Sequence, residues 1–207
     1  MKDISKLKRK PLVSIDIETY SPQTPPWKNG RKDPVVAFSM ASADEGEPSR
    51  GMTIITVIQP PEKEVKLLSQ VARLLQYFNG TQVWYYGYGA EKFDMPYLIY
   101  RSSLYGLDKE LINSVEKNPN IEVSDLAKRS FNLDPEYHLS MSNCEERLGI
   151  RRMLPKTIFN GASYHDYFDQ WRGSGSPLAI WYNQEDVLCT LNILHNIIDR
   201  TQTRKDE

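Results

Sequence analysis

The chain has 207 residues, and a hydrophobic content of 40% is enough to bury one substantial core. Its 26 Lys and Arg residues nearly balance 27 Asp and Glu residues, giving a formal net charge of −1. This balance excludes attraction of nucleic acid or acidic membranes by bulk charge, so any polyanion must bind at a local basic cluster. We expect a basic N-terminal arm at 1–11, a single domain at 12–200 and a polar C-terminal tail at 201–207.

The cysteines and the N-terminus predict a reduced, soluble protein. Cys144 and Cys189 lie in segments that read as helical and lack CxxC or Cys/His ligand spacing, so we expect two buried free thiols. No apolar run has the length of a membrane span, and the basic N-terminus is not followed by a signal-peptide apolar region. We therefore expect a cytoplasmic protein with no membrane partner.

Three strands are predicted first along the chain. LVSIDIE (12–18) is an apolar run that reads as a buried strand, although it contains two acids. VVAFSMAS (35–42) and MTIITVI (52–58) are rich in β-branched residues, and the polar turn between them predicts an antiparallel hairpin. The prolines and glycine of 21–34 predict a long surface loop.

Helices and strands alternate in the rest of the chain. Apolar residues three and four positions apart predict a helix over 62–78, and QVWYYGY predicts a strand over 82–88. Helices are predicted within 93–106, over 139–150 and over 177–200, and a short strand over 121–126. This order predicts an α/β fold, in which a mixed sheet of three antiparallel N-terminal strands plus parallel strands is flanked by helices.

The two acids in the first strand call for a partner. Residues two apart in a strand point to the same face, so Asp16 and Glu18 share one side while Val13, Ile15 and Ile17 take the other. At about 5 Å and an effective dielectric constant of about 20, the two carboxylates repel by about 3 kcal/mol. A hard divalent cation such as Mg²⁺ or Mn²⁺ prefers oxygen ligands, so the pair predicts a metal site. The Asp-x-Glu triplets at 108–110 and 134–136 lack a strand context and predict solvated surface.

Two further acids are candidates for the same site. Asp94 follows the predicted strand 82–88 at the start of a helix, where α/β sheets gather ligand sites, although a helix N-cap explains it equally well. Asp186 has Tyr182 four residues earlier on the same face of the last helix. A solvent-facing acid and a packing tyrosine are the alternatives for this pair.

In this order, SIDIET, YYGYGAEKFDMPYL and YNQEDVLCTL resemble the three exonuclease motifs of the DnaQ-like (DEDD, tyrosine-type) 3′–5′ exonucleases. The likeness is strongest to the proofreading exonuclease domain of family B DNA polymerases and to stand-alone YprB-like relatives, and it spans about residues 12–198. The resemblance implies an RNase H-like fold, with two Mg²⁺ or Mn²⁺ ions held by Asp16, Glu18, Asp94 and Asp186, and a water oriented by Tyr182. The implied reaction is hydrolysis from a 3′ end by a two-metal mechanism that releases nucleoside 5′-monophosphates.

Two positions discriminate within the superfamily. Its histidine-type branch would place His five residues before the last Asp, but Trp181 stands there. Proofreading domains commonly have Asn four residues before the Phe of the second motif, where this chain has Gly89. That Asn helps to position substrate or local structure in the family. Its replacement by glycine therefore bears on substrate positioning and on the local structure of the second motif.

Aromatic rings beside the motifs are candidates for stacking on the bases of a single strand. Two basic clusters are candidates for phosphate contacts: Lys28, Arg31 and Lys32 in the predicted loop, and Arg147, Arg151, Arg152 and Lys156. A solvated surface explains the basic clusters equally well. Tyr85, Tyr86, Phe159, Tyr164 and Tyr167 are expected to pack in the core. The expected substrate contacts are Thr19, Trp27, Phe93, Arg151, Arg152 and Lys156.

Three functions remain open at this point. The favoured one is a metal-dependent 3′–5′ exonuclease acting on single-stranded DNA. The fold and the acids do not determine the sugar, so an RNA-directed or structure-specific nuclease is the second. The third is a non-catalytic nucleic-acid-binding module, against which the complete set of acids and Tyr182 argues.

Overall fold

The computed structural model describes residues 12–23, 28, 30–43, 51–78, 84–118, 120–154, 159 and 161–206. Within them, a five-stranded sheet has the order β3-β2-β1-β4-β5. Both hairpin pairings, β1 with β2 and β2 with β3, are antiparallel, whereas β4 pairs parallel with β1 and with β5. The predicted mixed sheet is confirmed. Its strands are β1 (Leu12–Thr19), β2 (Val35–Ala43), β3 (Met52–Ile58), β4 (Trp84–Gly87) and β5 (Asn120–Glu122).

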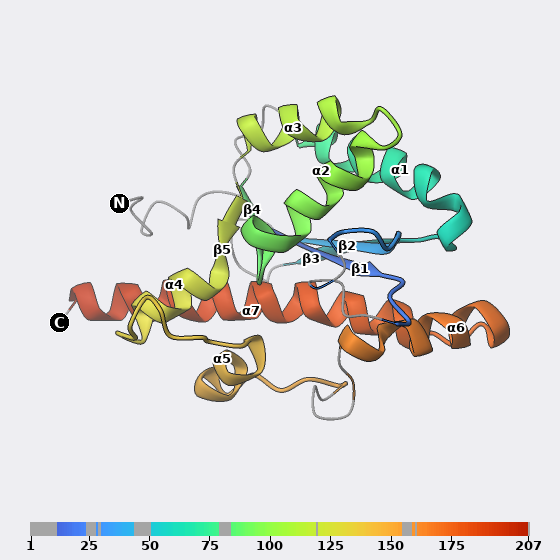
Figure 1. Cartoon of the computed structure of the whole chain (residues 1–207). Helices are drawn as coiled ribbons and strands as arrows, with labels where there is room; N and C mark the ends of the chain where they lie inside the picture. The colour runs from blue at the N-terminus through green and yellow to red at the C-terminus, as the bar shows by residue number, and fades with distance from the viewer. Residues whose placement is uncertain are drawn as a thin grey trace.

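Helices cover both faces of the sheet (Figure 1). Three lie on one face: α1 (Glu64–Tyr77), α2 (Met95–Ser103) and α3 (Asp108–Lys117). The other face is covered by α4 (Val123–Ser130), α5 (Met141–Leu148), α6 (Tyr164–Ser174) and the long α7 (Leu178–Asp206). Short turns of other helix types are η5 (Pro61–Lys63), η6 (Ala90–Asp94) and η7 (Gly161–Ser163); η6 is a π-helix.

The alternation of side chains along β1 divides the core. Val13, Ile15 and Ile17 are buried in the hydrophobic cluster that α1 and α2 complete. Leu12 belongs to a second cluster with residues of α4 and α7. Because Leu12 and Asp16 are an even number of residues apart, Asp16 faces the α7 layer, as the predicted strand requires.

Two predicted boundaries are wrong. The strand predicted over 121–126 ends at Glu122, because the Glu122 side chain accepts hydrogen bonds from the backbone N–H and hydroxyl of Ser124 and caps α4. The last helix is predicted to end near residue 200 but runs to Asp206. Thr201 donates a hydrogen bond from its hydroxyl to the carbonyl of Ile197 within this extension, so part of the predicted polar tail is helical.

Several expectations about burial are confirmed. Cys144 and Cys189 are buried free thiols. The predicted core tyrosines are buried, and Phe159 is half-buried.

No helix in the described ranges is both long enough and apolar enough to cross a membrane. The predicted basic arm, 1–11, lies outside the described residues.

The loop between β1 and β2 is tied down at its end by a buried ion pair. The Arg101 guanidinium donates to both carboxylate oxygens of Glu64 and, at 2.7 Å, to the carbonyl of Lys32. Glu64 also accepts a 2.8 Å hydrogen bond from the backbone N–H of Val35. Because Glu64 is only 1% exposed, this network fixes where β2 begins relative to α1 and α2.

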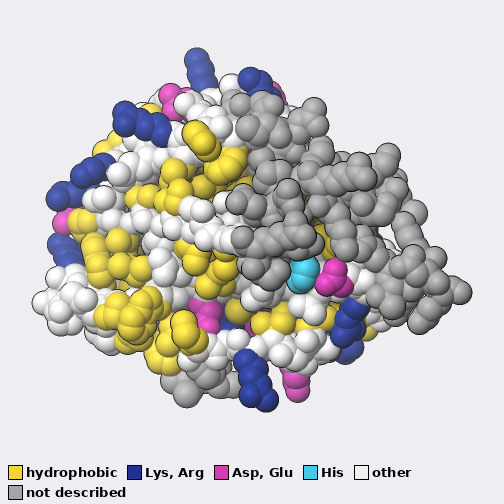
Figure 2. All heavy atoms as spheres, turned by 180° about the vertical axis from the view of Figure 1, so that it is seen from behind, with side chains coloured by type: hydrophobic (Ala, Val, Ile, Leu, Met, Phe, Trp, Pro, Cys, Tyr) yellow, Lys and Arg dark blue, Asp and Glu magenta, His cyan; other side chains and the backbone are white. Residues whose placement is uncertain are grey.

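Exposed hydrophobic side chains appear in separate patches. On the face opposite to that of Figure 1, they lie among neutral and charged groups (Figure 2). The most exposed large examples are Met153 at 82% and Tyr77 at 80%. Exposed apolar side chains are common on the surfaces of folded domains.

Gly87, the last residue of β4, allows η6 to turn back against β1. A Cβ added there would lie 2.3 Å from the Cβ of Ala90 and 3.1 Å from the carbonyl oxygen of Ile15. We expect Gly87→Ala to destabilise the protein by about 1–3 kcal/mol, because the turn must shift. The measurement is urea-induced unfolding.

The matched control for this substitution is Gly173→Ala. Gly173 lies in α6, and a Cβ there would meet nothing within 4 Å. Since alanine is the better helix former, the control should be neutral or stabilising by up to about 1 kcal/mol. Equal unfolding midpoints for the two variants would contradict the close approach at Gly87.

Candidate active site

Three of the predicted acids meet on the α7 side of the sheet. One carboxylate oxygen from each of Asp16, Glu18 and Asp186 lies within 4.8 Å of the others. Asp16 and Glu18 come from β1, and Asp186 comes from α7. The buried Ser14 hydroxyl donates a 2.8 Å hydrogen bond to the carbonyl of Val187, which holds α7 against β1 next to Asp186. Acids 168 to 170 residues apart in the chain are thus brought together.

Asp94 is the fourth predicted acid and is buried beside this cluster. It is the last residue of η6 and precedes α2, but its side chain makes no capping hydrogen bond, so the N-cap alternative does not hold. Its Oδ2 atom is buried and has no hydrogen-bond partner among the described residues. Burial, followed by repulsion from Asp16, Glu122 and Asp186, raises the pKa of Asp94 well above its ordinary value.

The raised pKa of Asp94 has a consequence for the stability of the metal-free protein. The folded state holds this proton to a higher pH than the unfolded chain, in which an Asp has a pKa of about 4. The free energy of unfolding should therefore fall as pH rises from about 4 through the raised pKa of Asp94. Thermal melts in EDTA over this range should show this fall, and Asp94→Asn should reduce it. The same pH dependence in both proteins would contradict the prediction.

The π-turn η6 is what presents Asp94, and Gly89 shapes it. The Gly89 carbonyl accepts hydrogen bonds from the backbone N–H groups of Lys92, Phe93 and Asp94, at 3.1, 2.7 and 3.4 Å. The Gly89 N–H donates to the buried carboxylate of Glu122 at 3.0 Å. Gly89 has a φ of +110°, which other residues rarely adopt. Glycine in place of the family's common Asn therefore fits the backbone of this turn.

Tyr182 lies on α7, one helical turn before Asp186. Its ring is 1% exposed and packs against Tyr164 and Tyr167, with ring centroids 5.9 and 5.8 Å away. Burial, and then the negative charge of Asp186, Glu18 and Asp16, raises the pKa of the Tyr182 hydroxyl. Tyr182 therefore keeps its proton at neutral pH and remains a hydrogen-bond donor beside the acids. The neighbouring Trp181 is instead 50% exposed.

Asn183 is a member of the site that the sequence analysis does not include. Its Nδ2 donates a hydrogen bond to Oδ2 of Asp16, and its side chain is fully buried. Asn183 is three residues before Asp186 and therefore on the same face of α7, a spacing that could have identified it. The sequence analysis also omits Glu122, although this residue ends a parallel strand, where ligand sites gather.

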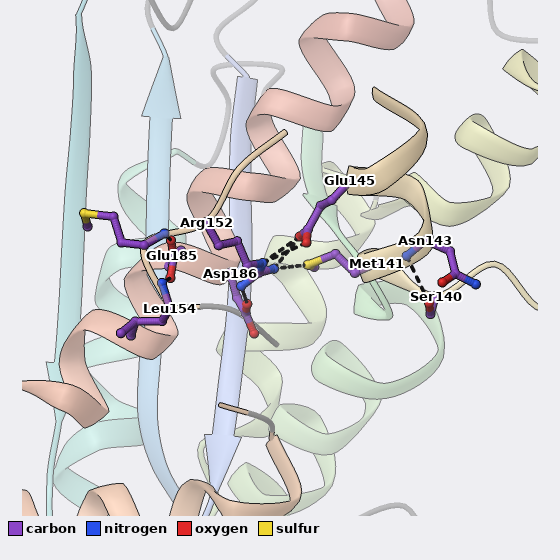
Figure 3. Close-up of polar contacts among 9 residues, drawn as sticks. Ser140, Met141, Asn143, Glu145, Arg152, Leu154, Glu185 and Asp186 are labelled. Carbon is purple, nitrogen blue, oxygen red and sulfur yellow. Dashed lines mark hydrogen bonds and ion pairs between the residues drawn. The ribbon is translucent and has the colours of Figure 1, made fainter. Parts of the chain in front are cut away.

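Arg152 joins the segment after α5 to α7 (Figure 3). Its Nη1 donates to Oδ1 of Asp186, and its Nε donates to the two Glu145 oxygens at 2.8 and 2.9 Å. The Arg152 side chain is 4% exposed, so it does not contribute to an open basic surface. Glu185 holds the same segment by accepting hydrogen bonds from the backbone N–H groups of Met153 and Leu154.

The comparisons with known proteins agree with this geometry. Residues 2–144 match the family described as DNA polymerase family B, exonuclease domain. The chain belongs to this family. The predicted family, RNase H-like fold and enzyme class, a 3′–5′ exonuclease, are confirmed. The match includes Asp16, Glu18 and Asp94 but ends before Tyr182 and Asp186.

Two solved structures share the fold of this exonuclease domain. The family B DNA polymerase of Pyrobaculum calidifontis has a TM-score of 0.67 and 18% identity, over 91% of this chain and 24% of the polymerase. Exonuclease I of E. coli has a TM-score of 0.52 and 14% identity, over 96% of this chain and 42% of that protein. The chain thus spans less than half the length of either. No curated protein matches the sequence.

The expected substrate contacts of the exonuclease domain differ in accessibility. Thr19 is buried and shares a 2.9 Å hydrogen bond with the hydroxyl of Ser21. Phe93 is half-buried, with its ring 5.1 Å from that of Tyr97, and Arg151 is exposed. Of the other three expected contacts, Arg152 is buried, as described above, and Trp27 and Lys156 lie outside the described residues.

The acids fit a hard divalent cation. Their donor atoms are all carboxylate oxygens, which Mg²⁺ and Mn²⁺ prefer. The unpartnered Oδ2 of Asp94 is a buried acceptor beside the other acids, and a cation would satisfy it. The chemistry of the donor set therefore agrees with a metal-dependent exonuclease.

Proposed function

We propose that this exonuclease domain degrades single-stranded DNA from its 3′ end and releases nucleoside 5′-monophosphates. The observation that supports this most strongly is the meeting of Asp16, Glu18 and Asp186, with the buried, unpartnered carboxyl of Asp94 beside them. Carboxylates gathered so closely repel one another unless cations are shared among them. The four acids are accordingly the proposed ligands of two Mg²⁺ or Mn²⁺ ions.

Bound divalent ions supply charge neutralisation for a phosphodiester and lower the pKa of an attacking water. Tyr182, kept protonated by burial and by the nearby acids, would donate its hydrogen bond to that water and hold it in line for attack. Arg152 would hold one oxygen of Asp186 in place, and Asn183 would hold one oxygen of Asp16. These side chains position groups and form no covalent bond with the substrate.

The preference for single-stranded DNA has separate support. Exonuclease I of E. coli, which shares the fold, was solved in complex with a dT13 oligonucleotide. Near the acids, the exposed Arg151 is a candidate phosphate contact. We also propose contacts from Thr19, Phe93, Trp27 and Lys156, with the aromatic rings stacking on bases.

Labelled oligonucleotides test this function. A 5′-labelled DNA strand should shorten one nucleotide at a time with Mg²⁺ or Mn²⁺, and a 3′-labelled strand should lose its label at once as a mononucleotide. EDTA should stop both reactions. Faster degradation of RNA would favour the RNA-directed alternative. Cleavage that survives chelation, or binding without cleavage in either metal, would overturn the proposal.

A further inference from the structure

A pocket of about 300 Å³ lies between η6, α4 and the loop that follows α4. This volume is at the lower end of the range for small-ligand sites. Its lining combines basic, acidic and apolar side chains. The ones that matter below are Lys92, Lys128, Arg129, Leu133, Pro135 and Glu136.

The sheet places this pocket along the same edge as the acids. β1, β4 and β5 are parallel, so their carboxyl ends lie at one edge, where α/β folds bind ligands. η6 follows β4, and α4 follows β5. β5 lies two strand spacings from β1, or about 10 Å. Single-stranded nucleic acid could cover this distance within a few nucleotides.

The turn η6 contributes residues both to the pocket and to the acid cluster. Asp94 and Lys92 are two residues apart in η6; Asp94 is buried among the acids, whereas Lys92 is exposed and lines the pocket. Glu122 makes a second link, because its charge raises the pKa of Asp94 and its side chain caps α4, whose first turn holds Asp125 of the pocket wall. The pocket and the acid cluster are therefore neighbours.

The charges of the pocket favour an anion next to an apolar group. Lys128 is engaged, donating to Asp125 at 2.7 Å and to the carbonyl of Pro135 at 2.9 Å, and its hydrogen bond lowers the pKa of Asp125. The side chains of Lys92 and Arg129 make no hydrogen bond or ion pair among the described residues, although the charge of each contributes to lowering the pKa of Asp125. Because Asp125 is already paired with Lys128, Lys92 and Arg129 are the cations of the pocket whose hydrogen-bond donors can meet a phosphate.

We propose that this pocket binds one nucleotide of the substrate strand, a few positions upstream of the scissile 3′ end. The phosphate would lie between Lys92 and Arg129, and the base would pack on the apolar surface of Leu133 and Pro135. Glu136 would accept a hydrogen bond from the sugar or base. The statement that this nucleotide belongs to the substrate strand rests on the proposed function, whereas the binding of a nucleotide here does not require hydrolysis.

Substrate length separates this pocket from the acid cluster. A dT12 oligonucleotide reaches both, whereas the p-nitrophenyl ester of thymidine 5′-monophosphate reaches only the acids. Arg129→Glu should raise the KM for dT12 about tenfold more than the KM for the ester. Arg129→Ala and Lys92→Ala should each reduce by about 0.7 the slope of log affinity for dT12 against log salt.

Lys66→Glu on the exposed side of α1 is the matched charge reversal and should change neither KM. The proposal for the pocket would be overturned if Arg129→Glu and Lys66→Glu changed KM equally. It would also be overturned if Arg129→Glu changed the KM values of the two substrates equally. If the wild-type protein hydrolyses neither substrate, the proposed function fails instead. The proposal for the pocket is then tested by dT12 binding, measured by fluorescence anisotropy in EDTA. Arg129→Glu should weaken the affinity about tenfold, whereas Lys66→Glu should not change it.

Discussion

Asp16→Asn is expected to reduce hydrolysis of a 3′-labelled oligonucleotide by at least about 10³-fold in Mg²⁺ or Mn²⁺. Asp16 has a carboxylate oxygen within 4.8 Å of those of Glu18 and Asp186. Its neutral replacement removes a hard anionic ligand, so the proposed ions lose a partner. The measurement is single-turnover product release at saturating metal.

The same substitution should leave folding intact. In EDTA, neutralising Asp16 relieves repulsion within the cluster, and we expect a melting temperature equal to or above that of the wild type. Glu110→Gln is the control, because it removes one negative charge from the exposed side of α3. Full activity in a folded Asp16→Asn protein, or an equal loss in the control, would refute the assignment of Asp16.

Arg152→Met is expected to cause the largest loss of stability. The Arg152 guanidinium is almost completely buried between Glu145 and Asp186, and its removal leaves two buried carboxylates without this partner. Breaking a buried ion pair from one side costs about 3–5 kcal/mol. For a domain of this size, that corresponds to a fall of about 6–20 °C in melting temperature. Thermal denaturation in EDTA measures it.

The neighbouring arginine offers a close control. Arg151 is exposed, so Arg151→Met should change the free energy of unfolding by no more than about 0.5 kcal/mol. The double variant Arg152→Met/Glu145→Met should recover part of the stability, because one unpaired carboxylate is removed with the arginine. A melting temperature for Arg152→Met within error of that of Arg151→Met would show that the ion pair contributes little.

Local patterns were sufficient for most of the sheet and for the identity of the acids. The apolar run broken by Asp16 and Glu18 predicted β1, and the period of two predicted that both acids face one layer. The pattern was also present for α6, where Tyr164, Tyr167 and Phe168 recur at steps of three and four, but the aromatic residues were read only as core. The strand predicted over 121–126 is too long because the helix already begins at Val123, where the Glu122 side chain caps it. Strand propensities do not take account of such a side-chain cap.

The sequence alone could not assign the side chains whose role depends on distant partners. Arg152 belongs by composition to a basic surface cluster, yet it is buried between Glu145 and Asp186. Gly89 departs from the family pattern, and only its φ of +110° and its contact with Glu122 show why glycine fits. In both cases the deciding contact joins segments more than five residues apart in the chain.

The sequence by itself determined which residue types this exonuclease domain can use: two acids in a strand, one after a strand, and one on a helix with a tyrosine four residues earlier. Periodicity along the backbone is local physics and can be read from the chain. Tertiary structure alone decided that these acids meet, and that an arginine and an asparagine hold two of them. Such contacts arise from the packing of α7 on β1, which depends on how the whole core is filled rather than on any one segment.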